Sequence, residues 1–139
     1  MYLVRLVYAS EVVRPVGDGD LEQILNSARE KNGEDGITGM LCFHRKYFLQ
    51  CLEGSRMKVN EAYQRILKDK RHTNIVILDY QEIVHREFEA WTMGYMPESQ
   101  LTTDINMRYS GNTEFTPFEM LGESCHLMMV ELKDTVPTI

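Results

Sequence analysis

The sequence has little of what nucleic-acid-binding, secreted or membrane-spanning proteins need. Its 15 Lys and Arg residues face 21 Asp and Glu residues, and the formal net charge of −6 argues against a phosphate-backbone partner. No apolar run approaches the ~20 residues that span a bilayer. The apolar part of the N-terminal stretch MYLVRLVYAS is too short for a secretory signal. We therefore expect a cytoplasmic protein that binds neither nucleic acid nor a membrane.

Cysteine and the common catalytic motifs are scarce as well. The three cysteines, Cys42, Cys51 and Cys125, are widely spaced in apolar surroundings, which indicates reduced core residues rather than disulfides or a metal site. The chain lacks the GxGxxG, P-loop, GxSxG, CxxC and HExxH motifs, and its four histidines lack metal-ligand spacing. The sequence therefore predicts no metal site and no enzyme of these kinds.

The first two thirds of the chain alternate strand and helix patterns, and 139 residues suit one domain. Helices are expected from Asp20 and from residues 54–55 onward. Strands are expected at residues 2–10, 36–43, 47–53, 75–80 and 91–96. This βαββαββ order predicts an α+β sandwich of the ferredoxin-like kind. Both helices should cover one face of the sheet, with the first and third strands as neighbours.

The two predicted helices carry polar residues beside their apolar stripes. Asn32 lies about 20° from Leu21 at 100° per residue, so a polar amide ends the buried stripe of the first helix. Asn32 and Gly33 are also typical of a helix terminus, because both adopt the left-handed conformation readily. In the second helix Arg65 and Asp69 stand one turn apart, a spacing at which ion pairs are common on solvated faces.

From Pro97 onward the composition changes, and we expect a C-terminal extension of residues 98–139 after a first domain of residues 1–97. A short helix is predicted at residues 104–109. The segment TPFE at residues 116–119 has the pattern of a strong helix start, with Thr as N-cap and Pro at N1. The helix after it would carry a narrow apolar seam of Phe118, Leu121, Cys125, Met128 and Leu132. We expect both helices on the free face of the sheet, with any leftover seam available for self-association or a partner.

The stretch FLQCLEG, residues 48–54, places an amide inside a predicted strand, and neither face of this strand is expected to be exposed to solvent. Phe48, Gln50 and Leu52 share one face. An unpaired buried amide costs roughly 1–3 kcal/mol, so Gln50 needs partners. Tyr8 and Asn32 also lie on buried stripes, and with Gln50 they can line a polar slot between helix and sheet. Spacing alone leaves two interpretations open: a structural hydrogen-bond network, or a site that reads the carbonyl and imide edge of a heterocycle.

Five separated segments resemble one family, in the same order along the chain. They are LVYAS around Tyr8, AREKNGEDGITGML around Asn32, FLQCLEG around Gln50, DKRHTNI from Asp69 and REFEAWTMG from Arg86. On these segments, residues 2–96 are similar to the BLUF domains, blue-light sensors that use flavin adenine dinucleotide (FAD). The tail, with RYSGNTEF and a final helix, more loosely resembles short stand-alone members in which two helices follow the sensor.

The resemblance implies a non-covalent flavin on the helix-covered face of the sheet, FAD with FMN or riboflavin as substitutes. By this resemblance Asn32 pairs with the pyrimidine edge of the ring, Gln50 bridges flavin and Tyr8, and Tyr8 donates the electron and proton. The remaining implied cofactor residues are the apolar walls Ile24, Phe48, Leu52 and Ile66 and the polar residues Arg65 and Asp69. For Lys31 the choice stays open between a phosphate contact and a solvated lysine.

The family also implies a route for the signal. Light would leave Gln50 rotated or tautomerised, and Trp91 and Met93, expected on one face of the fifth strand, would pass the change to the C-terminal helices. The other interpretation of Trp91 and Met93 is core packing. Ala28 stands where many members have Ser, so a hydrogen bond to Gln50 or to the fifth strand is expected to be missing. With no output domain in the sequence, we expect a homo-oligomer or a separate response protein to receive the signal.

Two other functions are compatible with this scaffold. A light-insensitive ligand-binding or interaction module would keep the pocket without the switch. A small phosphatase would use Arg65 and Asn32. Absorption spectra separate both from a photoreceptor, because only the photoreceptor shifts its flavin spectrum reversibly in light.

Overall fold

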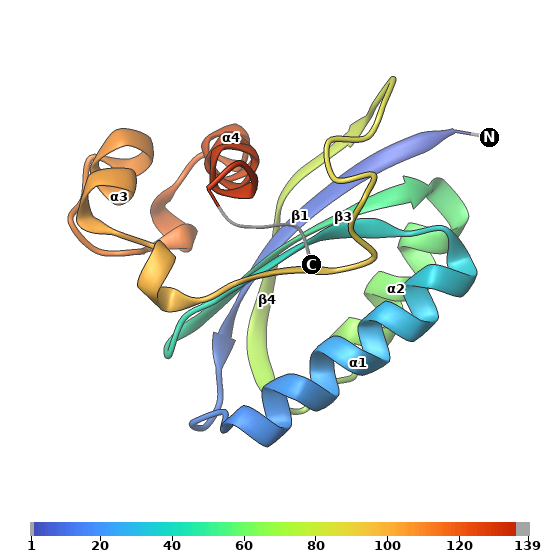
Figure 1. The fold of residues 1–139 in the computed structure, drawn as a ribbon, viewed down its shortest axis with the longest axis horizontal. Helices are drawn as coiled ribbons and strands as arrows, with labels where there is room; N and C mark the ends of the chain where they lie inside the picture. The colour runs from blue at the N-terminus through green and yellow to red at the C-terminus, as the bar shows by residue number, and fades with distance from the viewer. Residues whose placement is uncertain (1, 136–139) are drawn as a thin grey trace.

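The computed structural model describes residues 2–135, and within them one sheet lies between two groups of helices (Figure 1). The strands are β1 (Leu3–Val12), β2 (Thr38–Phe43), β3 (Tyr47–Ser55), β4 (His72–Glu82) and β5 (Gly94–Met96). The helices on one face are α1 (Asp18–Asp35) and α2 (Arg56–Leu67), and those on the other are α3 (Thr103–Ser110) and α4 (Gly122–Lys133). The 3-10 turns η1 (Glu98–Gln100) and η2 (Pro117–Glu119) precede α3 and α4. Within the described residues no helix is both long and apolar enough to cross a membrane.

The strand order β4-β1-β3-β2-β5 confirms the predicted α+β architecture. β1 is antiparallel to β3 and to β4, and β3 is antiparallel to β2. The helical connections α1 and α2 therefore each join two parallel strands that have a third strand between them, as in a ferredoxin-like fold. The short β5 adds a parallel edge beside β2. In the β1–β3 ladder Tyr8 is the direct partner of Gln50.

Two cores lie on the two faces of this sheet. The core under α1 and α2, here the pocket-side core, contains Val4, Leu6, Tyr8, Leu25, Ile37, Leu41, Phe48, Leu52, Val59, Ala62 and Met93. The core under the C-terminal segment, here the tail-side core, contains Val7, Ala9, Met40, Cys42, Leu49, Cys51, Phe88, Trp91, Met96, Leu101, Ile105, Phe115, Met120, Cys125, Met128, Met129 and Leu132. The cysteines are all buried and free, as predicted.

Alternation along β3 divides its side chains between the two cores. Phe48 and Leu52 enter the pocket-side core, whereas Leu49 and Cys51 enter the tail-side core. Gln50, between them, faces the same way as Phe48 and Leu52 and is 6% exposed. The prediction that neither face of this strand is exposed to solvent is therefore confirmed.

The predicted helix end at Asn32-Gly33 is wrong. α1 continues to Asp35 and ends at Gly36, which has φ 69° in the left-handed region. The backbone N–H groups of Gly36 and Ile37 donate to the carbonyl of Asn32 and close the last turn. Gly36 is the residue that can take this conformation without a Cβ penalty, and Asn32 keeps its side chain on the buried stripe.

The expected fifth strand is also shorter than predicted. It begins at Gly94, because the N–H of Trp91 donates to the carbonyl of Phe88 in a turn. Alternation therefore does not hold over residues 91–93. Trp91 packs in the tail-side core and Met93 in the pocket-side core, so the expectation that they share one face is wrong. The indole of Trp91 lies against Gly94, where an added Cβ would come within 1.9 Å of Cε3.

The last helix starts later than the TPFE pattern predicts. Pro117–Glu119 form only the turn η2, because Met120 returns to an extended conformation with φ −101° and ψ 152°. α4 then begins at Gly122, where an added Cβ would lie 2.0 Å from the carbonyl oxygen of Leu78 in β4. This close approach sets α4 on the sheet. Of the predicted seam, Cys125, Met128 and Leu132 are buried, whereas Leu121 is 75% exposed.

The C-terminal segment packs on the free face of the sheet, as its place in the tail-side core shows. The division into a domain of residues 1–97 and an extension of residues 98–139 stays a prediction. The ends of both ranges, residue 1 and residues 136–139, lie outside the described residues.

Candidate functional site

A pocket opens between α1, α2 and the sheet and contains about 850 Å³ of space, part of it open to solvent. The lining residues are Tyr8, Ile24, Ser27, Ala28, Lys31, Asn32, Leu41, Phe48, Gln50, Leu52, Ala62, Arg65, Ile66, Asp69, Arg71 and His72. Every residue expected to hold the cofactor is among them, although their role in binding stays a prediction.

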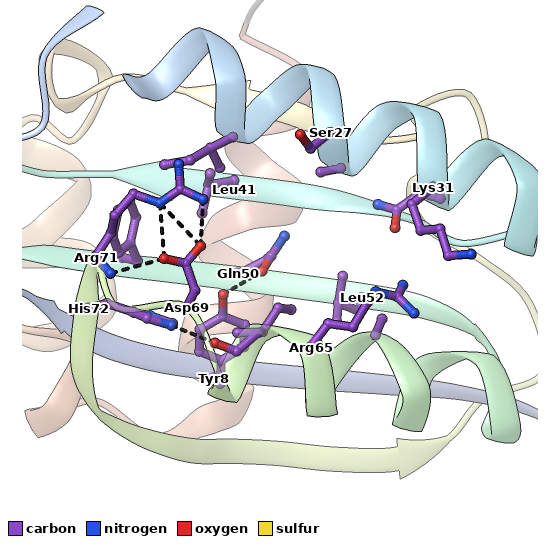
Figure 2. A pocket seen from close by; sticks show the side chains of 16 residues that line it. Tyr8, Ser27, Lys31, Leu41, Gln50, Leu52, Arg65, Asp69, Arg71 and His72 are labelled. Carbon is purple, nitrogen blue, oxygen red and sulfur yellow. Dashed lines mark hydrogen bonds and ion pairs between the residues drawn. The ribbon is translucent and has the colours of Figure 1, made fainter. Parts of the chain in front are cut away.

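Tyr8 and Gln50 form the polar centre of this pocket (Figure 2). The hydroxyl of Tyr8 donates to Oε1 of Gln50 at 2.5 Å, and Nε2 of Gln50 donates to the sulfur of Met93 at 3.3 Å. Burial, and then the nearby Asp69 and Tyr63, raise the pKa of Tyr8, so its phenol keeps its proton. The amide inside β3 thus connects β1 to the segment before β5.

α1 holds that same segment with two side chains. Nδ2 of Asn32 donates to the carbonyl of Thr92 at 2.8 Å, and Nε of Arg29 donates to the carbonyl of Met93 at 3.0 Å. The bond to Thr92 uses only one donor of the Asn32 amide, which has a second N–H and a carbonyl oxygen for a ligand. Ala28, one turn earlier, lines the pocket but has no side-chain donor.

Asp69 pairs with Arg71 rather than with Arg65. α2 ends at Leu67, so the four-residue helical spacing between Arg65 and Asp69 does not form. Arg71 instead makes a two-pronged contact, with Nη2 at 2.6 Å from Oδ2 and Nε at 2.9 Å from Oδ1 of Asp69. These hydrogen bonds lower the pKa of Asp69. Figure 2 shows Arg71 and Asp69 at one end of the pocket and Lys31 at the other.

His72 lines the pocket and was missed by the sequence analysis, as was Arg71. Its Nε2 lies 2.8 Å from the carbonyl oxygen of Ile66, and its Nδ1 lies 2.7 Å from the hydroxyl of Ser10. A carbonyl can only accept, so Nε2 carries a hydrogen, and in the neutral imidazole Nδ1 then accepts from Ser10. His72 thereby ties the end of α2 to β1, beside Tyr8. Arg71 and His72 both belong to the segment DKRHTNI, one of the five segments on which the family resemblance rests. The sequence therefore contained a signal for both residues.

Beyond the pocket, a buried carboxylate holds the loop that leads to Trp91. Glu53 of β3 is 0% exposed, and it accepts hydrogen bonds from the backbone N–H of Glu87 at 2.7 Å and of Phe88 at 3.0 Å. The ring of Phe88 lies 6.2 Å from that of Trp91 in the tail-side core. Nζ of Lys133 in α4 donates to the carbonyl of Glu87 at 2.8 Å. The loop therefore contacts β3 and α4 together.

Within residues 2–135, no three His, Cys, Asp or Glu side chains come together in a way that could hold a metal ion. The pocket instead offers apolar walls with a few convergent polar groups, an arrangement typical of sites for flat organic ligands.

The comparison with protein families agrees with this geometry. The family model described as sensors of blue-light using FAD (BLUF) matches residues 3–94. The beta subunit of photoactivated adenylate cyclase from Euglena longa is 34% identical over 102 residues, which are 73% of this chain and 12% of that protein. The blue light- and temperature-regulated antirepressor BluF of Escherichia coli is 34% identical over 76 residues, 55% of this chain and 19% of that protein. The chain thus spans a small part of the curated relatives that it matches.

Two solved structures match along nearly their whole length. BlsA in its photo-activated state has a TM-score of 0.80 at 32% identity, with 94% of both chains covered. BlrB in its dark state has a TM-score of 0.79 at 26% identity, with 96% of both chains covered. The matched family model describes a sensor. By its fold, its pocket and its match over residues 3–94, the chain belongs to the BLUF family, the sensors of blue-light using FAD.

Proposed function

We propose that the protein is a blue-light photoreceptor whose switch is the hydrogen-bonded pair of Tyr8 and Gln50 in a pocket that holds FAD. The observation that carries the proposal is the 2.5 Å bond from the Tyr8 hydroxyl to Oε1 of Gln50 in the pocket lining. A merely structural amide does not require an open pocket beside it. The pocket-facing pair is therefore better explained by a ligand that both residues serve.

The residue types of the lining suit an isoalloxazine ring. Ile24, Phe48, Leu52 and Ile66 supply apolar walls for a flat ring. The amides of Asn32 and Gln50 supply donors and acceptors for its pyrimidine edge, since each amide presents both kinds of group side by side. Arg71, fixed by Asp69, adds a positioned cation at one end of the pocket. The same features would bind FMN or riboflavin, because they contact the ring that all three flavins share.

When bound, the flavin would absorb blue light and withdraw one electron from a neighbouring phenol, returning it as the excitation decays. A phenol that has lost an electron is strongly acidic, and the hydroxyl of Tyr8 already donates to Oε1 of Gln50. The proton therefore has a formed path at hydrogen-bond distance, which proton transfer requires. Its transfer to the amide and its return leave Gln50 rotated or tautomerised, with a changed set of donors toward the pocket.

A changed Gln50 loses its present contact with Met93, which is the first step of the proposed signal route. Nε2 of Gln50 is the atom that donates to the Met93 sulfur. Met93 lies two residues from Trp91, which packs against Phe88 in the tail-side core with α4. A local change becomes a signal when it biases an element with two arrangements, and the segment from Glu87 to Met93 contacts both the pocket and α4.

We further propose that the signal is read outside this domain, by a second copy of the chain or by a separate response protein. The Euglena relatives are named as subunits of a photoactivated adenylate cyclase, and the Escherichia coli relative is named as an antirepressor. Members of the family thus connect one sensor to different outputs. A cytoplasmic location is part of the same proposal.

The test is the absorption spectrum of the purified protein, in the dark and after blue light. The proposal requires a flavin spectrum that shifts slightly to the red without bleaching and returns in darkness. A protein that stays yellow but does not respond to light would be a light-insensitive binding module. A colourless protein that cannot be reconstituted with any flavin would overturn the proposal entirely.

A further inference from the structure

The cations that line the pocket are all engaged by carboxylates within the described residues. Arg71 is held by Asp69 at 2.6 Å, Lys31 lies 3.7 Å from Glu34, and Arg65 lies 3.6 Å from Asp35. Three positive charges around a flavin site would ordinarily favour a phosphorylated ligand, because phosphate binds well to Arg and Lys. Here each charge has a partner of the opposite sign before any ligand arrives.

Asp35 differs from the other two partners in its burial and in the number of cations it serves. Its side chain is only 8% exposed, and its two carboxylate oxygens face Lys58 at 3.7 Å and Arg65 at 3.6 Å. Asp35 is the last residue of α1, whereas Lys58 and Arg65 belong to α2. The carboxylate therefore joins the two helices that frame the pocket and holds Arg65 toward the end of α1.

We propose that Asp35 prevents the site from discriminating between flavins by their phosphate groups. It neutralises Arg65, so that the site recognises the ring and not the phosphate. The inference rests on the proposed flavin-binding function and specifies its selectivity. In the native chain, riboflavin, FMN and FAD then bind with similar affinity, because the phosphates meet no unpaired cation among the lining residues. Without the Asp35 charge, Arg65 becomes available to a phosphate, and FMN and FAD gain over riboflavin.

The test is the ratio of dissociation constants for riboflavin and FMN, measured by fluorescence quenching on the refolded or reconstituted chain at low salt. Asp35→Asn keeps the side-chain size and removes the charge. We expect it to raise the preference for FMN by roughly two- to fivefold, the size of an exposed ion pair. Added salt should reduce this gain, since it screens contacts between exposed charges and phosphate. Asp104→Asn is the matched control, because it makes the same replacement in α3, on the face of the sheet opposite to the pocket.

A general loss of structure would weaken binding of every flavin equally and leave the ratio unchanged, so the ratio separates selectivity from folding. Arg65→Gln in the native background should change the ratio by less than twofold, and in the Asp35→Asn background it should abolish the gain. An unchanged ratio in Asp35→Asn, or a strong preference for FMN in the native chain that Arg65→Gln removes, would overturn the inference. Failure of the native chain to bind any flavin would instead overturn the proposed function.

Discussion

The hydroxyl of Tyr8 donates a 2.5 Å hydrogen bond to Oε1 of Gln50, and the two residues are direct partners in the antiparallel β1–β3 ladder. The bond therefore joins two central strands, and the register of the sheet fixes its geometry. Opposed side chains of such a ladder have Cβ atoms about 4.5–5.5 Å apart, which suits a phenol and an amide in contact. The proposed switch thus bridges two paired strands in the interior of the sheet.

Replacing Tyr8 by Phe removes the phenol and keeps the ring. We expect Tyr8→Phe to retain flavin, because the apolar walls are unchanged, and to lose the red-shifted state, because no proton donor faces Gln50. Light-minus-dark absorption spectra measure this directly. Tyr63→Phe is the matched control, since its ring lies 5.9 Å from that of Tyr8 and its hydroxyl has no role in the proposed switch. A wild-type shift in Tyr8→Phe would refute the mechanism.

Replacing Gln50 by Leu removes the proton acceptor and leaves the buried hydroxyl of Tyr8 unpaired. We expect Gln50→Leu to lose the red shift as well, and to lower the free energy of unfolding by about 1–3 kcal/mol, the cost of an unsatisfied buried group. Urea denaturation measures the second effect. Adding Tyr8→Phe should recover much of the lost stability but none of the light response. If the double variant is as unstable as the sum of both changes, the two side chains do not act as a pair.

The close contact between Trp91 and Gly94 predicts the effect of one added methyl group. Gly94→Ala would place Cβ within 1.9 Å of the indole, so Trp91 must move out of its place in the tail-side core. We expect a loss of roughly 1–3 kcal/mol in the free energy of unfolding, as overpacking usually produces. Gly33→Ala is the control. Its Cβ would meet nothing within 4 Å in α1, and alanine there should stabilise the helix by up to about 1 kcal/mol.

The stability of the protein should depend on pH through His126 in α4. Burial first, and then the positive charge of Arg5, lower the pKa of His126 to about 4, below its ordinary value of about 6.5. Between these values the unfolded chain binds the proton more readily, so the free energy of unfolding falls as the pH decreases from about 6.5 to about 4.

We expect His126→Gln to flatten this part of the profile, measured as urea midpoints between pH 7 and pH 4. The control is His85→Gln, because the side chain of His85 is 70% exposed. Equal slopes in the native chain and in His126→Gln would contradict the assignment.

The sheet and the pocket were predictable because their signals are periodic. Alternation placed Phe48, Gln50 and Leu52 on one face of β3, and the helical period placed Asn32 on the buried stripe of α1. The structure brings these residues to one pocket. The folded protein keeps the faces that these patterns predict, because each strand and helix is stabilised by burying one face.

The sequence-based predictions were wrong where the local sequence allows two conformations or two partners and tertiary contacts select one of them. Asn32-Gly33 and Gly36 all tolerate a helix end, and only the structure shows that Gly36 takes the left-handed conformation. Trp91 continued an apparent strand pattern, yet its N–H closes a turn with Phe88. The pairing of Arg65 was likewise undetermined, because Asp35 lies in a different helix, 30 residues away along the chain.

Because the side chains of β3 are divided between two cores, the strand should not tolerate insertions or deletions. Inserting or deleting one residue between Tyr47 and Ser55 would turn every later side chain of the strand to the opposite face. Gln50 or Leu52 would then be exchanged with Leu49 or Cys51, and both cores would fail together. We therefore expect natural variation in length at the exposed residues 45–46 and not within the nine residues of β3.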